Sequence, residues 1–173
     1  MRAVLGLFER LWLLTCVLGA GCLPGFILQY RQRLLGRLDQ VTFDLAPWRA
    51  IAARHHNGSL DALIAHHRAS ADPTFVDEAQ AIEMMLQSET SLRESINAIQ
   101  GNLFEQTYGW ITHVEWADAQ AVWTLYQPTF PLDADGLVFA MSFGVLLWLL
   151  PVSLVWLWRR RLASKAWSGH HMR

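Results

Sequence analysis

The chain has 173 residues, a hydrophobic fraction of 53% and nine Trp, whereas only 17% of its residues are charged. Soluble domains carry about 25% charged residues, so the composition argues against an ordinary soluble protein, and the length allows one domain. Segment 29–136 has seven Arg, no Lys and fourteen acidic residues, a net charge of −7. This acidity disfavours nucleic acid as a partner.

Two uncharged runs predict membrane spans. The first extends from Trp12 to Leu28 and the second from Leu137 to Trp158. As a helix the second would be about 33 Å long, enough for the hydrocarbon core of a bilayer. A buried core helix is the alternative, but Arg159-Arg160-Arg161 follows the second run and Trp lies near the ends of both. We therefore predict transmembrane helices at 11–28 and 137–158.

The first run has two further interpretations. A cleaved signal peptide fits poorly with Glu9 before the run and with Pro24-Gly25 near its end. A lipoprotein signal ending at Cys22 is suggested by Leu18-Gly19-Ala20-Gly21-Cys22, although the large apolar residue lies one place too early. Cys16 and Cys22 are six residues apart, too far along one helix for a disulfide.

The basic residues near the spans predict the orientation. Residues 1–10 and 159–173 carry Arg and Lys, whereas no basic residue lies between Arg93 and the second span. We expect both ends to be cytoplasmic, with residues 29–136 in the periplasm of a Gram-negative cell. Trp12, Trp156 and Trp158 would then form an aromatic belt at one interface.

The middle segment shows helical periodicity and no lasting strand alternation. A first stripe is interrupted by Pro47, where we expect a kink or a restart. It consists of Leu34, Leu38, Val41, Leu45, Trp48 and Ala52. Asn57-Gly58 ends this helix, Ser59 caps a short one to about residue 69, and Asp72-Pro73 starts the next.

A second heptad stripe follows, interrupted by Glu78 and Glu89. It consists of Phe75, Ile82, Met85, Leu92, Ile96, Ile99 and Leu103. Gly101 and Gly109 predict breaks, and a last helix is expected from Ile111 to Tyr126, before Pro128 and Pro131. The fold class is thus an all-α membrane protein with two transmembrane helices flanking a coiled-coil-like hairpin. The stripes either pack against each other or leave part of the seam for a partner or a second copy.

No catalytic residue, cofactor site or metal site is predicted. The adjacent histidines at 55–56, 66–67 and 170–171 point about 100° apart on a helix and cannot chelate as pairs. A zinc or copper site would combine His56 with His66 or His67 and take His113 or Glu115 as a third ligand, but this spacing matches no metal signature. Small residues within the spans favour close helix contacts; the candidates are Gly19, Gly21, Gly25, Ser142 and Gly144.

Two stretches beside the spans form a recognisable pattern. The first is Leu23-Pro24-Gly25-Phe26 with Gln29-Tyr30-Arg31-Gln32-Arg33-Leu34-Leu35-Gly36 and Asp39. The second is Tyr126-Gln127-Pro128-Thr129-Phe130-Pro131-Leu132 with Gly136-Leu137-Val138. Together they resemble the uncharacterised proteobacterial domain-of-unknown-function 2937 family. The resemblance implies a two-pass inner-membrane protein with a helical middle, and it brings no activity, cofactor or catalytic residue.

Physically, the two stretches predict a polar collar at the membrane surface that contacts lipid or a partner. Its candidates are Gln29, Tyr30, Arg31, Arg33, Asp39, Pro128, Pro131 and Gly136. Arg31 and Arg33 oppose the positive-inside preference, which is tolerable if they pair with Asp39, Asp133, Asp135 or lipid phosphate. Simple interfacial anchoring is the plainer interpretation.

The sequence therefore predicts a non-enzymatic membrane protein that acts by binding. It would be an accessory or scaffold subunit of an inner-membrane complex, or a homo-oligomer, with lipids and a membrane protein or a second copy as partners. The alternative is a periplasmic ligand or metal sensor that signals through its spans. A membrane enzyme with an unrecognised site is the third interpretation.

Overall fold

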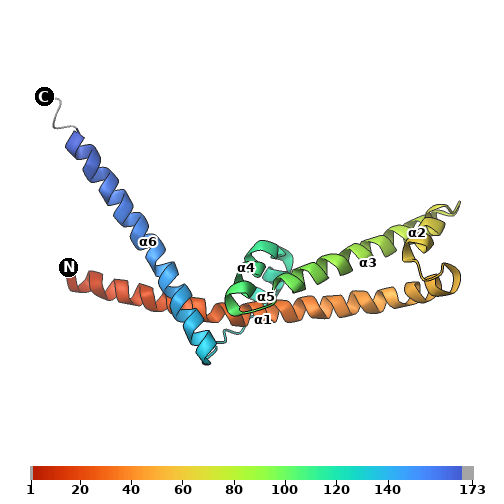
Figure 1. Ribbon diagram of the computed structural model, residues 1–173, viewed down its shortest axis with the longest axis horizontal. Helices are drawn as coiled ribbons and strands as arrows, with labels where there is room; N and C mark the ends of the chain where they lie inside the picture. Colours follow the sequence, from red (N-terminus) through yellow and green to blue (C-terminus); the bar gives the residue numbers. More distant parts are fainter. Residues whose placement is uncertain (1, 169–173) are drawn as a thin grey trace. The chain divides into compact units, whose positions relative to one another are not determined.

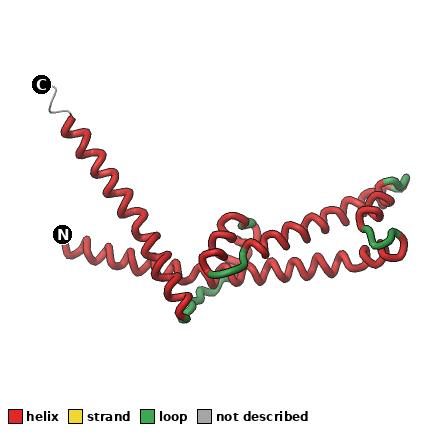
Figure 2. The backbone as a smooth tube through the Cα atoms, in the orientation of Figure 1, coloured by secondary structure: helices red, strands yellow, loops and turns green. Residues whose placement is uncertain are grey.

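The computed structural model describes the backbone of residues 2–168 and the side chains of residues 6–153. These residues form only helices: α1 (Arg2–His55), α2 (Leu60–Arg68), α3 (Pro73–Ala98), α4 (Leu103–His113), α5 (Trp116–Leu125) and α6 (Ala134–Ser168) (Figure 1). Short loops join them (Figure 2). They divide into two compact units, which we call the span unit (residues 1–26 and 127–173) and the hairpin unit (residues 27–126).

The span unit contains the two predicted membrane helices. Within the described residues, α1 and α6 are both long and apolar enough to cross a membrane. Only 33% and 22% of their most apolar windows are buried, and large side chains such as Leu14, Leu18 and Leu146 are exposed. The core helix of a soluble protein would be mostly covered by its own chain, so this low burial favours spans. The expectations for Trp156, Trp158, the three following arginines and the terminal histidines lie outside the described side chains.

The hairpin unit places the second part of α1 beside α3, with α2 in the connection between them (Figure 1). The turn after α1 follows the prediction, because Asn57 and Gly58 have φ values of 52° and 81°. Ser59 caps α2 by accepting a hydrogen bond from the Ala62 N–H at 3.1 Å. Asp72 caps α3 by accepting one from the Thr74 N–H at 2.9 Å, with proline in the first turn.

Most residues of the two predicted apolar stripes face the inside of the hairpin unit, but Phe75 is exposed. A core of Leu45, Ile64, Ala79 and Ile82 joins α1, α2 and α3, and Val41, Trp48, Leu60, Met85 and Leu86 pack around it. Along α1 and α3, Leu34, Ala52, Leu92, Ile96 and Ile99 are also buried. Leu38, Val41 and Met85 are half-buried. The apolar periodicity therefore predicted the core correctly, with part of each stripe at its rim.

Pro47 does not restart the helix, contrary to one of the two sequence-based expectations. Residues on both sides belong to α1, which is continuous from Arg2 to His55. Proline removes the hydrogen bond to the carbonyl four residues earlier, here that of Phe43. Phe43 and Pro47 are both exposed. The Phe43 carbonyl therefore lies on an outer face of the hairpin unit, where losing its helical hydrogen bond does not leave a buried polar group.

Two predictions in the last part of the hairpin unit were wrong. Gly109 does not break a helix but lies within α4, where an added Cβ would come within 1.7 Å of the Ala98 carbonyl oxygen. Its function is therefore close contact with the end of α3. The helix expected from Ile111 to Tyr126 is divided by Val114 and Glu115, which separate α4 from α5.

Replacing Ile82 with Ala should lower the free energy of unfolding of the full chain in detergent by about 2–5 kcal/mol, because it leaves a cavity at a fully buried position. Met84→Ala is the matched control, since Met84 is exposed on the same helix; its effect should stay within about 0.5 kcal/mol. Denaturant unfolding followed by circular dichroism measures both. Equal stability of the two variants would contradict this core.

Candidate functional site

A buried carboxylate joins α5 to α1 within the hairpin unit. Asp118, in the first turn of α5, is only 2% exposed. Its Oδ1 accepts a hydrogen bond from Nε of Arg33 at 2.8 Å, and its Oδ2 accepts one from Arg37. Arg37 also lies 3.6 Å from the Glu115 carboxylate. Two arginines one turn apart on α1 therefore hold the start of α5, where the helix dipole also favours negative charge.

Tyr30 fixes the turn that precedes α5. Its side chain is fully buried, and its hydroxyl accepts a hydrogen bond from the backbone N–H of Glu115 at 3.0 Å. No helical carbonyl accepts the first N–H groups of a helix, so this hydroxyl satisfies one of them. Tyr30, Arg33, Arg37, Glu115 and Asp118 together form the Asp118 cluster. It begins two residues beyond Leu28, the last residue of the first uncharged run.

The Asp118 cluster corrects the expected pairing of the collar arginines. Arg33 pairs with Asp118, 85 residues away in the sequence, whereas Asp39 is exposed. Arg37, which was not among the predicted site residues, pairs with the same carboxylate. Of the other predicted residues in this stretch, Gln29 and Arg31 are half-buried.

The second predicted stretch builds the start of α6 in the span unit. The Asp133 carboxylate accepts a hydrogen bond from the Gly136 N–H at 3.2 Å. Gly136 is buried, and an added Cβ would lie 2.6 Å from Pro131. Pro128 is exposed. Each stretch is thus ordered by its own contacts, and the collar that would combine them stays a prediction.

Three of the five predicted small residues serve contacts between α1 and the second half of the span unit. An added Cβ would come within 1.9 Å of the Phe130 ring at Gly21 and within 2.1 Å of the Thr129 hydroxyl at Gly25. At Gly144 it would lie 2.6 Å from Cα of Val17. Gly144 therefore allows close contact between α6 and α1, whereas Gly21 and Gly25 leave room for the segment that precedes α6.

The remaining two small residues lie on outer faces of the span unit. Nothing lies within 4 Å of a Cβ added at Gly19, and Ser142 is exposed. The structure thus separates the predicted small residues into an inner set and an outer set.

A second buried carboxylate joins α3 to α1. Glu89 is 6% exposed, and its Oε2 accepts a hydrogen bond from Arg49 at 2.6 Å, while Oε1 accepts one from Arg93 at 2.9 Å. Burial alone would raise the pKa of Glu89, but the hydrogen bonds and positive charges of Arg93 and Arg49 hold the pKa below its ordinary value of 4.5. The ionised form therefore stabilises the contact between the two helices.

The histidines gather at the far end of the hairpin unit. The rings of His56 and His66 have centroids 5.3 Å apart, so the turn does bring these two together. His67 is buried against Trp48 and Phe75, with Nδ1 3.7 Å from the Glu78 carboxylate. In the described residues, no group of three or more His, Cys, Asp or Glu side chains is placed to hold a metal ion.

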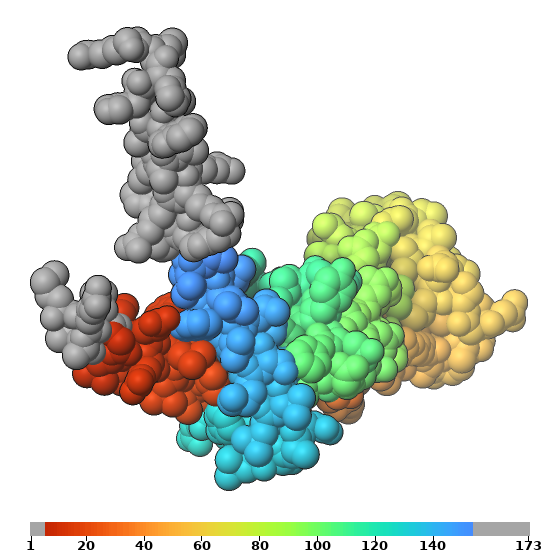
Figure 3. All heavy atoms as spheres, turned by 60° about the vertical axis from the view of Figure 1, so that its left-hand side comes forward, coloured from red at the N-terminus to blue at the C-terminus, as the bar shows by residue number. Residues whose placement is uncertain are grey.

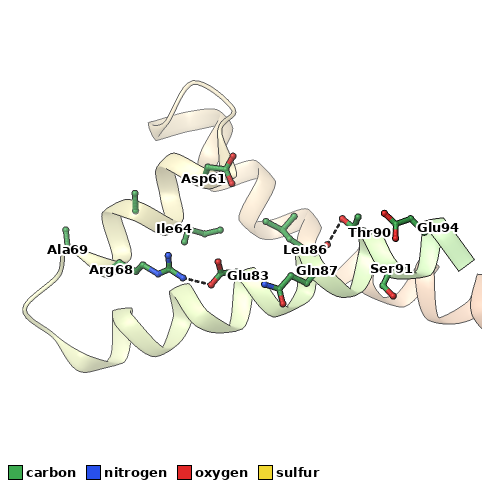
Figure 4. Close-up of a pocket in the computed structure, with 11 residues that line it drawn as sticks. Asp61, Ile64, Arg68, Ala69, Glu83, Leu86, Gln87, Thr90, Ser91 and Glu94 are labelled. Atoms are coloured by element: carbon green, nitrogen blue, oxygen red, sulfur yellow. Dashed lines mark hydrogen bonds and ion pairs between the residues drawn. The ribbon is translucent and has the colours of Figure 1, made fainter. Parts of the chain in front are cut away.

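An open groove lies between α2 and α3 at the same end (Figure 4). Asp61, Ile64 and Arg68 line it from α2, and Glu83, Gln87 and Glu94 from α3. Arg68 and Glu83 form an ion pair across it. No sequence pattern predicts this groove, because it depends on how the two turns direct α2.

The structure places this chain in a definite class: an all-helical protein with two helices that are able to span a membrane. Residues 4–164 match the model of the family described as "Protein of unknown function (DUF2937)". The chain belongs to that family, as the residues beside the spans indicated. Neither the comparison with curated proteins nor that with solved structures produced a match.

Acid should weaken the contact at Glu89. Because the folded pKa lies below the unfolded value of 4.5, the contribution of Glu89 to stability is complete above that pH and is lost as the pH falls through the folded pKa. We expect Glu89→Gln to be less stable than the wild type at neutral pH and to lose less stability on acidification below 4.5.

Glu94→Gln is the control, because it removes the same charge from an exposed position of α3. Thermal unfolding of the full chain in detergent, measured across this pH range, compares the three proteins. If Glu89→Gln and the wild type lost stability in parallel as the pH fell, the ion pairs of Glu89 would not stabilise the fold.

Proposed function

We propose that this chain is a two-pass protein of a bacterial inner membrane, with both ends in the cytoplasm and the hairpin unit in the periplasm. The exposed apolar surfaces of α1 and α6 support membrane insertion. The order of the close contacts supports a pair of oppositely directed spans: Val17 contacts Gly144, whereas Gly21 and Gly25 contact Phe130 and Thr129. The basic residues in both tails support the orientation.

We infer further that the protein acts by binding, as an accessory or scaffold subunit of a membrane complex or as a homo-oligomer. The observation that carries this proposal is the division of the small residues in the spans. The inner set is occupied by contacts within the chain, whereas nothing lies within 4 Å of a Cβ added at Gly19, which is exposed on α1. A glycine between large side chains lets the backbone of another helix approach closely.

The charged groups of the hairpin unit support the same proposal. The two most deeply buried carboxylates, Asp118 and Glu89, are each bound by two arginines. Arg33 and Arg37 join α1 to α5 and Arg49 joins α1 to α3, whereas Arg93 lies on the same helix as Glu89. The arginine side chains are 41–57% exposed, so solvent screens these pairs and breaking one costs less than breaking a fully buried pair. These ion pairs therefore stabilise the packing of helices in the hairpin unit, which is consistent with a scaffold function.

The partner face is tested by photocrosslinking in native membranes. Thr15 lies one turn before Gly19 on the same face, whereas Leu14 is five residues from Gly19 and about 140° away around the helix. Both are exposed. A photoreactive residue at position 15 should capture a protein of defined mass, and one at position 14 should capture lipid.

Gly19→Leu should remove the protein adduct without disturbing the fold, because nothing lies within 4 Å of a Cβ there. A second copy with a different tag distinguishes self-association from another subunit. Capture of lipid alone at both positions would contradict the proposal. If the purified monomer then bound a small ligand at the groove between α2 and α3, the sensor alternative would replace it.

A further inference from the structure

The helices α4 and α5 expose apolar and aromatic side chains on their outer faces. On α4, Phe104, Tyr108 and Ile111 are separated by four and three residues, which places them on one face. On α5, Trp116, Trp123 and Leu125 are exposed, and Trp123 stacks on Tyr126. Figure 3 shows atoms of α4, in green, on the face of the molecule turned toward the viewer. Thr107, Gly109, Ala119 and Val122 of the same two helices are buried.

The Asp118 cluster limits how far these helices can lie from the end of the first span. The contacts of α5 with α1 are made at Tyr30, Arg33 and Arg37, and the uncharged run ends at Leu28. At 1.5 Å per residue, these positions are about 3, 8 and 14 Å beyond Leu28 along the helix axis. The polar interface of a bilayer leaflet is about 5–8 Å thick, so α5 starts at the depth of the headgroups.

The composition of the exposed face fits that depth. Trp and Tyr concentrate at membrane interfaces, because they combine an apolar ring with a polar N–H or O–H group. From Glu94 to Gly136 the chain has no Lys or Arg, so attraction to anionic lipid does not hold this segment. Its acidic groups nearby are engaged, since Glu105 closes the N-terminal cap of α4 and Asp118 is paired.

We propose that α4 and α5 form an interfacial element whose exposed aromatic face lies in the headgroup region of the bilayer that holds α1. This inference rests on the proposed membrane anchoring and adds a third point of contact with lipid, beside the two spans. Tyr108, Ile111 and Trp116 enter the interface, and the Asp118 cluster fixes the depth at which they do so. The membrane-proximal end of the hairpin unit is thereby held at the membrane surface.

Spin labels on the full chain in phosphatidylcholine vesicles test this proposal. Cys16 and Cys22 are replaced by Ala, and single cysteines are introduced for labelling at Trp116 and Tyr108. Phe43 is the matched control, because it is as exposed as Trp116, at 75%, but lies fifteen residues beyond Leu28 on α1, about 22 Å along the axis. Labels at 116 and 108 should collide more with dissolved oxygen than with a water-soluble nickel chelate, and the label at 43 should show the reverse.

A label at Leu146, which is exposed on α6, distinguishes failure of the interfacial element from failure of the membrane anchoring. If it reports hydrocarbon while 116 and 108 report water, the interfacial element is wrong and the membrane anchoring stands. Shielding of 116 and 108 from both reagents would also overturn the inference, because it would mean that a second copy covers this face. If the label at 146 reports water, anchoring and interfacial element both fail.

Discussion

Two helical surfaces without charge constrain the whole chain. From Trp12 to Leu28 and from Leu137 to Trp158 no side chain carries a charge. The described part of the second stretch is mostly exposed, whereas the first combines exposed side chains such as Leu14 and Leu18 with buried ones such as Phe26 and Ile27. The exposed apolar side chains of these two stretches are unfavourable in water and favourable in lipid. Within the span unit, Gly144 lets the two helices contact closely, and Gly21 and Gly25 leave room for Phe130 and Thr129 before α6.

A second constraint concerns the arginines that follow the first span. Positive charge next to a span normally marks the cytoplasmic side, and Arg33 and Arg37 lie on the side that we assign to the periplasm. Their pairing with Asp118 compensates this charge locally. The same contact positions α5, and with it the aromatic residues of α4 and α5, so one buried carboxylate serves both the charge balance and the fold of the hairpin unit.

Local signals in the sequence predicted much of this fold. The apolar stripes located the core around Leu45 and Ile82, and the turn residues from Asn57 to Pro73 gave the helix boundaries, because caps and periodicity act within a few residues. Glu89 interrupted a stripe, but the sequence did not indicate that its carboxylate is buried or that Arg49 is its partner.

What the sequence could not provide depends on contacts between distant segments. Nothing near Val114 predicts the break between α4 and α5, because Tyr30 stabilises it from 85 residues away. Gly109 is the opposite case. Glycine commonly ends helices, but here it lies within α4 and is required for close packing on α3. Asp118 was missed for the same reason: a carboxylate in the first turn of a helix is common, and only the fold places two arginines against it.

The orientation of the chain in the membrane is the central claim, and accessibility of single cysteines tests it most directly. In a chain whose Cys16 and Cys22 are replaced by Ala, a cysteine at the exposed turn residue Asn57 should react with a membrane-impermeant maleimide in intact cells. A cysteine at His170 should react only after the cells are opened. Labelling of position 170 in intact cells, with position 57 protected, would contradict the proposed topology.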